Sequence, residues 1–211
     1  MLIVPAILEK EREMIEQKVR SARENGLNMV QIDIADGKFV PNTTYNNFSF
    51  IGKLDIGIEA HLMVVDPLEK MEILKKHDNT KKVIIHREAL SANEISKLIR
   101  KKEKSGIAIN PATRLEDTYD LIANGVIEHI LFMGVTPGFS GKKFQESVLD
   151  KIRLFNHKIR SGITSAVDGG VNERTAKLMN EAGVSWINAS SFIWNPDGTI
   201  NRINLAWLKG L

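Results

Sequence analysis

The sequence predicts a single-domain (β/α)8 barrel, and three observations support this fold class. Eight short apolar runs rich in β-formers recur along the 211 residues, and stretches with helical spacing lie between them. The runs are near-continuous in Val, Ile and Leu, as expected for parallel strands that are covered by helices. No Pro/Ser-rich linker or low-complexity tract divides the chain, so residues 1–211 are expected to form one domain. A doubly wound open sheet is the competing arrangement, because it shows the same alternation.

The expected strands are spread over the whole chain. The first begins at the apolar N-terminus and ends before the charged residues Glu9, Lys10 and Glu11. These charges come too early for a signal peptide, so none is expected. The predicted strands are residues 2–8, 29–34, 57–64, 82–86, 106–110, 129–135, 164–167 and 186–189.

The stretches between the strands have the apolar spacing of amphipathic helices. In one of them, Ile95, Leu98 and Ile99 fall on a single helical face. Glycine follows several of these stretches and is a common signal for the end of a helix: Gly26, Gly125 and Gly183. The predicted helices are residues 9–24, 66–76, 91–103, 115–123, 143–157 and 172–182.

Composition excludes several classes of protein. Hydrophobic residues make up 43% of the chain and charged residues 26%, which is the composition of a folded globular protein. The net charge of +3 is small and scattered, so we expect no nucleic-acid partner. The absence of cysteine excludes disulfides and thiol chemistry and fits a cytoplasmic protein. No apolar stretch is long enough to span a membrane, and no membrane partner is expected.

Polar residues gather where the predicted strands end, which is where the active sites of such barrels lie. Any single carboxylate there could simply cap a helix or close a turn. Several polar strand ends on one rim are harder to explain in this way. They are Asp33, Asp36, His61, His86, Glu88, Asn110, Asp168, Ser190 and Ser191.

Three loops after strands are suited to binding phosphate. Residues 135–142 form a glycine-containing loop, Asp168 is followed by Gly169 and Gly170, and residues 189–191 follow the last strand. Backbone N–H groups in such loops can hold an anion, because glycine allows a close approach of the chain. A tight turn would explain any one glycine pair, but the three loops together favour a phosphorylated ligand.

Six fragments, in order along the chain, resemble the ribulose-phosphate 3-epimerase family. They are QIDIADGKFVPN (31–42), HLMV (61–64), HRE (86–88), NPAT (110–113), MGVTPGFSG (133–141) and VDGGV (167–171). The resemblance extends from Pro5 to about Phe192. It implies a TIM barrel, a pentulose 5-phosphate substrate, carbohydrate metabolism in the pentose phosphate pathway, and a divalent metal such as Zn, Fe, Mn or Co. A homo-oligomer is also expected.

The resemblance implies a role for each matching residue. Inversion next to a ketone needs an acid/base group on each face of a planar enediolate, and the family's two metal-bound aspartates fall on Asp33 and Asp168. The metal would stabilise the charge of the enediolate, and His61 matches a further metal ligand. Met63 and Met133 match residues that line the family's pocket, although ordinary barrel packing explains them equally well. The implied substrate-binding residues are His61, Gly138, Phe139, Ser140, Gly141, Gly169, Gly170, Ala189 and Ser190.

The chain also departs from the family pattern. Gln31 stands where a metal-binding histidine is expected, and its amide oxygen would be a weak ligand that favours manganese or magnesium over zinc or iron. Ala6 and Ala35 replace a serine and a methionine and would leave space in the pocket. Ser140 and Ala189 replace glycines of the phosphate site.

These departures leave two alternatives open beside ribulose 5-phosphate. The first is 3-epimerisation of another ketose phosphate, such as a hexulose 6-phosphate. The second is a sugar-phosphate-binding protein without catalysis. The related barrel decarboxylases use an Asp-x-Lys-x-x-Asp pattern, and Asp33-Ile-Ala-Asp36 lacks its lysine, so that chemistry is not expected.

Overall fold

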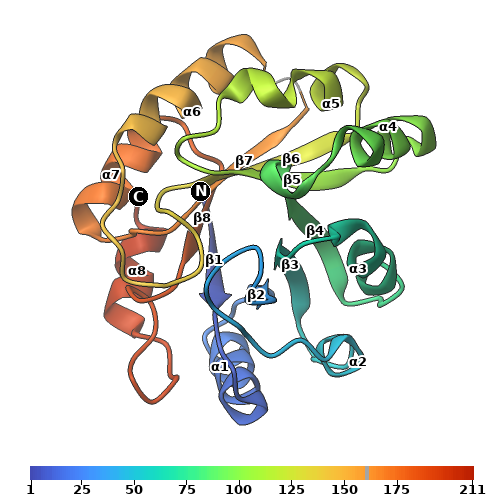
Figure 1. Cartoon of the computed structure of the whole chain (residues 1–211). Coiled ribbons are helices and arrows are strands. Elements are labelled where there is room, and N and C mark those ends of the chain that lie inside the picture. Colours follow the sequence, from blue (N-terminus) through green and yellow to red (C-terminus); the bar gives the residue numbers. More distant parts are fainter. Residues whose placement is uncertain (160–161) are drawn as a thin grey trace.

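The computed structural model describes residues 1–159 and 162–211, and its strands form a closed parallel barrel (Figure 1). The strands pair in chain order and β8 pairs with β1, which confirms the (β/α)8 barrel and excludes the open sheet. The strands are β1 (Leu2–Ile7), β2 (Met29–Ala35), β3 (Gly57–Met63), β4 (Thr80–His86), β5 (Ser105–Ile109), β6 (Ile127–Met133), β7 (Thr164–Asp168) and β8 (Trp186–Ala189).

The register of the strands brings the polar strand ends to one level of the barrel. Asp33 of β2 pairs with His61 of β3, and Met133 of β6 pairs with Asp168 of β7. Because all strands run in the same direction, their carboxyl ends open on the same rim. The predicted strand ends therefore meet in space, although they are far apart in the sequence.

Helices surround the barrel on the outside (Figure 1). The helices are α1 (Arg12–Glu24), α2 (Phe48–Ile51), α3 (Pro67–Leu74), α4 (Ala92–Lys101), α5 (Tyr119–Ala123), α6 (Ser147–Lys158), α7 (Glu173–Glu181) and α8 (Arg202–Lys209), with short 3-10 turns at Arg87–Ala89 and Leu115–Thr118.

The sequence missed α2 and α8 and began α6 too early. α2 has only four residues, too few to show helical spacing, and α8 lies after the last predicted strand. The predicted helix at 143–157 begins only at Ser147, because the segment before it packs against the β6 and β7 loops. There, Gln145 donates its backbone N–H to the carbonyl of Gly134.

Two different environments fill the molecule. The main apolar core lies between the barrel and the helices. The barrel interior is partly apolar, with a cluster formed by Ile84, Ala108, Leu131, Met133 and Ala166. The rest of the interior is polar, with side chains that are fully buried: Gln31, Glu59, His61, His86, His129 and Asn188. Buried polar groups need partners inside the protein, so this half of the barrel is a candidate for function.

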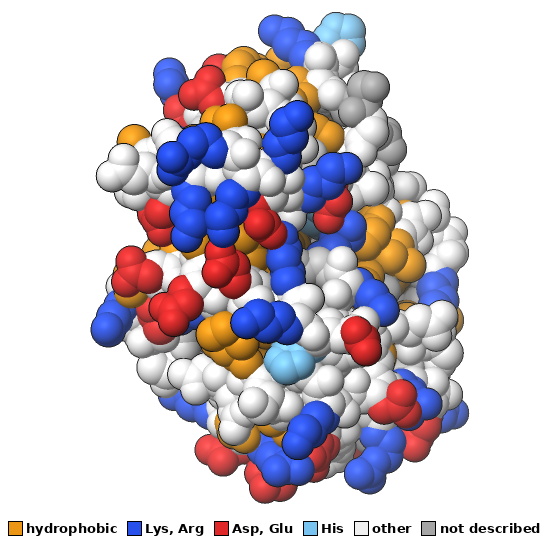
Figure 2. Space-filling view, turned by 90° about the vertical axis from the view of Figure 1, so that its right-hand side faces the viewer, with side chains coloured by type: hydrophobic (Ala, Val, Ile, Leu, Met, Phe, Trp, Pro, Cys, Tyr) orange, Lys and Arg blue, Asp and Glu red, His pale blue; other side chains and the backbone are white. Residues whose placement is uncertain are grey.

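The surface that includes α3 and α4 carries both signs of charge (Figure 2). Lys75 pairs with Glu103 and Lys101 pairs with Glu72, so opposite charges alternate there. Within the described part of the chain, no helix is long and apolar enough to cross a membrane.

Candidate active site

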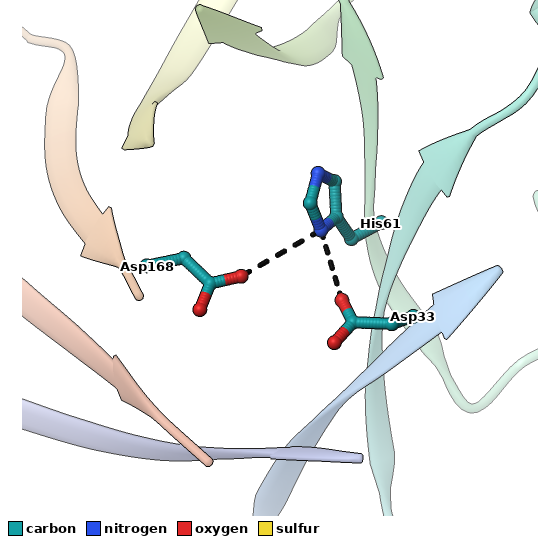
Figure 3. A group of neighbouring side chains, drawn as sticks. All are labelled: Asp33, His61 and Asp168. Carbon is teal, nitrogen blue, oxygen red and sulfur yellow. Dashed lines mark hydrogen bonds and ion pairs between the residues drawn. The ribbon is translucent and has the colours of Figure 1, made fainter. Parts of the chain in front are cut away.

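Three side chains from β2, β3 and β7 meet at the carboxyl end of the barrel (Figure 3). His61 Nδ1 lies 2.9 Å from Asp33 Oδ1 and 3.7 Å from Asp168 Oδ2. One atom from each residue lies within 4.8 Å of the others, and all three residues are buried. Carboxylate oxygens and an imidazole nitrogen are ligands that divalent cations accept, so this donor set fits such a cation.

Asp36, also at the end of β2, has a structural role. One of its carboxylate oxygens accepts the backbone N–H groups of Lys38 and Phe39, and the other accepts that of Val65. Burial acts to raise the pKa of Asp36, but these three donors outweigh it and lower the pKa. This strand-end carboxylate closes a turn, whereas Asp33 faces the pocket.

The electrostatics of the cluster favour proton exchange by Asp168. Burial and the nearby Asp33 raise the pKa of Asp168 to about 7. Burial acts to lower the pKa of His61, but its hydrogen bond to Asp33 and the charges of Asp33 and Asp168 raise it. A carboxyl group whose pKa lies near neutrality can serve as either an acid or a base.

Gln31 bridges the two aspartates from below. Its Nε2 donates to Asp33 Oδ1 and to Asp168 Oδ2, each at 2.7 Å. Its Oε1 accepts from Nδ2 of Asn188, which also donates to Glu59 Oε1 at 2.5 Å. This orientation differs from the expected weak ligation through the amide oxygen, because the Gln31 amide presents its N–H groups to the carboxylates. A fourth ligand would require the amide to turn and to lose its bond from Asn188.

A pocket opens above the three buried residues. Asp33, His61 and Asp168 form part of its lining. The other predicted site residues in the lining come from the loops after β6, β7 and β8: Gly138, Phe139, Ser140, Gly141, Gly169, Gly170 and Ser190. Met63 and Met133 also line it. The structure therefore brings together the acid/base candidates and most of the predicted phosphate-binding residues.

The loops after β6 and β7 approach each other closely because glycine occupies three positions. A Cβ on Gly134 would lie 2.5 Å from the carbonyl oxygen of Gly169, and a Cβ on Gly170 would lie 2.8 Å from the backbone of Phe144. Gly169 and Gly170 also have positive φ angles of 99° and 70°, which other residues rarely adopt. The two loops therefore pack as one unit at the rim.

Three residues singled out from the sequence lie away from the pocket. Ala189 is fully buried in the main core, and Ser191 lines the pocket in its place. Ala6 is fully buried, and Ala35 packs against Val40 and Met63. The expected space at Ala6 and Ala35 is therefore absent from the pocket lining.

Sequence reasoning missed the polar residues beneath the site. Glu59 and Asn188 lie inside predicted strands, and neither was singled out. The available signal was the spacing of two between Gln31 and Asp33 and between Glu59 and His61. Residues two apart on a strand point to the same face, so polar residues at this spacing indicate a polar barrel interior.

A closed parallel barrel with an acidic and imidazole cluster on its rim, next to glycine loops, defines a TIM-barrel enzyme that works at the carboxyl ends of its strands. Residues 2–194 match the model of the Ribulose-phosphate 3 epimerase family. The chain therefore belongs to this family, as the resemblance of its motifs implied.

Relatives and solved structures agree with this membership. The ribulose-phosphate 3-epimerase of Chlamydia muridarum is 32% identical, over 99% of this chain and 95% of the relative. That of Bacillus subtilis is 31% identical, over 91% of each. Phospho-2-dehydro-3-deoxyheptonate aldolase of Thermotoga maritima matches all of this chain and 68% of its own, with a TM-score of 0.64 at 12% identity. The thiamine phosphate pyrophosphorylase of Pyrococcus furiosus matches 99% and 92%, with a TM-score of 0.57 at 16% identity. These two structures show the shared fold alone.

Proposed function

We propose that the chain interconverts D-ribulose 5-phosphate and D-xylulose 5-phosphate, with Asp33 and Asp168 as its acid and base. Membership of the epimerase family supports the reaction, and the relatives carry the name of this activity. The observation that carries the proposal is the pair of buried carboxylates, which come from β2 and β7 and face one point of the pocket. Residues 1–211 act as one domain in this proposal, since β8 closes the barrel on β1.

The reaction is inversion at C3, next to the C2 ketone. One aspartate, ionised, takes the proton from C3, and the electrons of the C–H bond move into an enediolate. The other aspartate, protonated, then gives a proton to C3 from the opposite face. The pKa of about 7 at Asp168 supports one aspartate as the base and the other as the acid. Like charges so close together favour one protonated and one ionised carboxyl group.

The donor set of Asp33, His61 and Asp168 would hold a divalent cation. When bound, such a cation supplies positive charge next to the C2 and C3 oxygens of the sugar. Two carboxylates and one imidazole form an oxygen-rich set, so manganese or cobalt fits at least as well as zinc or iron. With Gln31 acting as a hydrogen-bond donor, this proposal assigns three protein ligands.

The phosphate group would bind at residues 138–141, Gly169, Gly170 and Ser190. These residues line the pocket on the side of the glycine loops, where backbone N–H groups can face an anion. Calorimetry with xylulose and xylulose 5-phosphate tests this assignment. We expect far tighter binding of the phosphate ester, and equal affinity for the two compounds would overturn it.

The packing of Ala6 and Ala35 removes the argument for a six-carbon sugar. A larger substrate was considered because the small side chains of Ala6 and Ala35 would leave space in the pocket. Both side chains are packed away from the pocket lining. We therefore expect ribulose 5-phosphate to be the better substrate when it is compared directly with a hexulose 6-phosphate.

One assay tests the function as a whole. Ribulose 5-phosphate is supplied to metal-stripped and metal-refilled protein in deuterium oxide, and xylulose 5-phosphate is measured by a coupled enzyme. We expect metal-dependent turnover with deuterium at C3 of the product. Binding without turnover would favour a protein that only holds sugar phosphates, and product without label would contradict the enediolate route.

A further inference from the structure

A string of hydrogen bonds extends from the back of His61 to the protein surface. His61 points Nδ1 at the aspartates and its other ring nitrogen away from them (Figure 3). That nitrogen, Nε2, lies 2.9 Å from Nε2 of His86, and Nδ1 of His86 lies 3.2 Å from Oε2 of Glu88. The string thus runs from an aspartate through two imidazoles to a second carboxylate, and none of the steps proposed above uses its outer half.

Glu88, at the outer end of this string of hydrogen bonds, acts only as an acceptor. Oε1 of Glu88 accepts the backbone N–H of Asn110 at 2.8 Å and the hydroxyl of Thr113. Burial acts to raise the pKa of Glu88, but its donors, with His86 first, lower it to about 2. An ionised carboxylate can only accept, so Nδ1 of His86 must carry a hydrogen and donate it.

The acceptor role of Glu88 determines which ring nitrogens of His86 and His61 donate. Two ring nitrogens that lie 2.9 Å apart cannot both carry a hydrogen, so one of the facing Nε2 atoms donates and the other accepts. In the neutral ring of His86, a hydrogen on Nδ1 leaves the lone pair on Nε2, so Nε2 of His86 is the acceptor. The facing Nε2 of His61 must therefore be the N–H donor.

The position of the hydrogen on His61 decides whether Nδ1, which faces the aspartates, has a free lone pair. The carboxylate of Asp33, 2.9 Å away, attracts a hydrogen to Nδ1 of His61, and a neutral ring with its hydrogen on Nδ1 has no lone pair on that atom for a cation between the aspartates. A hydrogen held on Nε2 by His86 instead leaves Nδ1 as the free nitrogen of the neutral ring. Partners of this kind commonly orient histidine ligands of metals.

We propose that His86 and Glu88 are positioning residues that keep the hydrogen of His61 on Nε2 and so present Nδ1 to a divalent cation. This inference rests on the role of His61 in the proposed function. It adds two residues to the site, neither of which touches the substrate or the cation.

The variant Glu88→Gln tests the inference because it should reverse the donor and acceptor roles along the string. The backbone N–H of Asn110 needs an acceptor, so the amide oxygen of the new side chain takes the place of Oε1 and its NH2 group faces His86. His86 must then accept at Nδ1 and donate from Nε2, which moves the hydrogen of His61 to Nδ1. Since the two side chains have the same shape, we expect a similar melting temperature.

Manganese binding, followed by electron paramagnetic resonance, gives the first readout. We expect Glu88→Gln to weaken manganese 10- to 100-fold, the usual effect of losing such a partner. Glu116→Gln is the matched control: it removes one negative charge from the same side of the barrel, on an exposed residue without a contact to His86, and should leave the affinity unchanged. Equal manganese affinity in Glu88→Gln and the unaltered chain overturns the inference.

Nitrogen-15 NMR of the histidine rings in the zinc-loaded protein gives the second readout. We expect hydrogens on Nε2 of His61 and Nδ1 of His86, and a shift to Nε2 of His86 in Glu88→Gln. A hydrogen on Nε2 of His86 in the unaltered chain overturns the inference, even if the variant fails to fold.

The inference and the proposed function fail in different ways. Manganese binding that depends on Glu88, in a chain that does not epimerise ribulose 5-phosphate, supports the inference and contradicts the function. Epimerase activity with manganese affinity independent of Glu88 does the reverse. A chain that binds no divalent cation overturns both the metal assignment and the inference.

Discussion

The polar half of the barrel interior has two levels, which contain similar residues in different states. The upper level holds Asp33, His61 and Asp168, and all three line the pocket. The lower level holds Glu59, His129 and Asn188, which are fully buried and lie outside the pocket lining. Each level has a carboxylate and an imidazole, so residue type alone does not explain why only one of them faces the pocket.

The neighbours of the two histidines shift their pKa values in opposite directions. In the upper level, two aspartates raise the pKa of His61 against the effect of burial. In the lower level, burial and Lys82 lower the pKa of His129 to about 3. Its Nε2 and Oε2 of Glu59 lie 3.8 Å apart, and neither has a hydrogen-bond partner among the residues that the structure describes. The comparison shows that neighbouring carboxylates oppose the effect of burial at His61, whereas Lys82 adds to the effect of burial at His129.

The largest expected effect comes from the upper level. Asp33→Asn and Asp168→Asn should each lower turnover by at least ~100-fold, the lower end of what general acid–base groups contribute. The amide keeps the shape of the side chain but cannot take the proton from C3. Steady-state kinetics measures the effect, and circular dichroism checks that each variant is folded. Turnover near that of the unaltered chain in either variant would contradict the two-carboxylate mechanism.

The lower level should affect stability rather than turnover. Burial raises the pKa of Glu59 from 4.5 to about 7, so between these values the folded chain holds a proton that the unfolded chain has lost. The free energy of unfolding should therefore fall as the pH rises through this range, by about 3 kcal/mol from this group. Glu59→Gln, which keeps the neutral shape, should remove this dependence with little change in turnover.

Urea unfolding at pH 5 and pH 8 measures the effect of Glu59→Gln. Glu128→Gln serves as the control, because Glu128 is the neighbour of His129 on β6 and points to the other face of the strand. A loss of turnover in Glu59→Gln as large as in the aspartate variants would erase the distinction between the two levels.

The smallest expected effect concerns Gln31, which joins the two levels. Gln31→His should replace an N–H donor with a cation ligand and tighten zinc by about tenfold or more, a change on the scale usually seen when supporting groups around a metal are altered. Competition with a chelator measures this affinity. Tight stoichiometric zinc in the unaltered chain, found by elemental analysis, would show that Gln31 does not weaken the site.

The sequence was sufficient for the barrel and for the residues at its rim. The alternation of apolar runs and helical spacing predicts the fold, and Asp33, His61 and Asp168 lie near the ends of predicted strands, so their convergence follows from parallel pairing. The direction of the Gln31 amide could not be predicted, because it depends on Asn188, 157 positions away, and on Glu59. The neighbours of a buried side chain inside a closed barrel are set only when the last strand joins the first.

The close packing of Gly134, Gly169 and Gly170 also limits how this protein can diverge. A side chain at any of the three would collide with backbone or with packed neighbours, so these three positions tolerate almost no substitution. Leu8, Met63 and Met133 line the wall of the pocket with side chains and do not depend on a glycine conformation. In a library of random variants, the glycines should remain nearly invariant while the wall varies. A descendant that accepts a different ligand would therefore change at the wall and keep the three glycines.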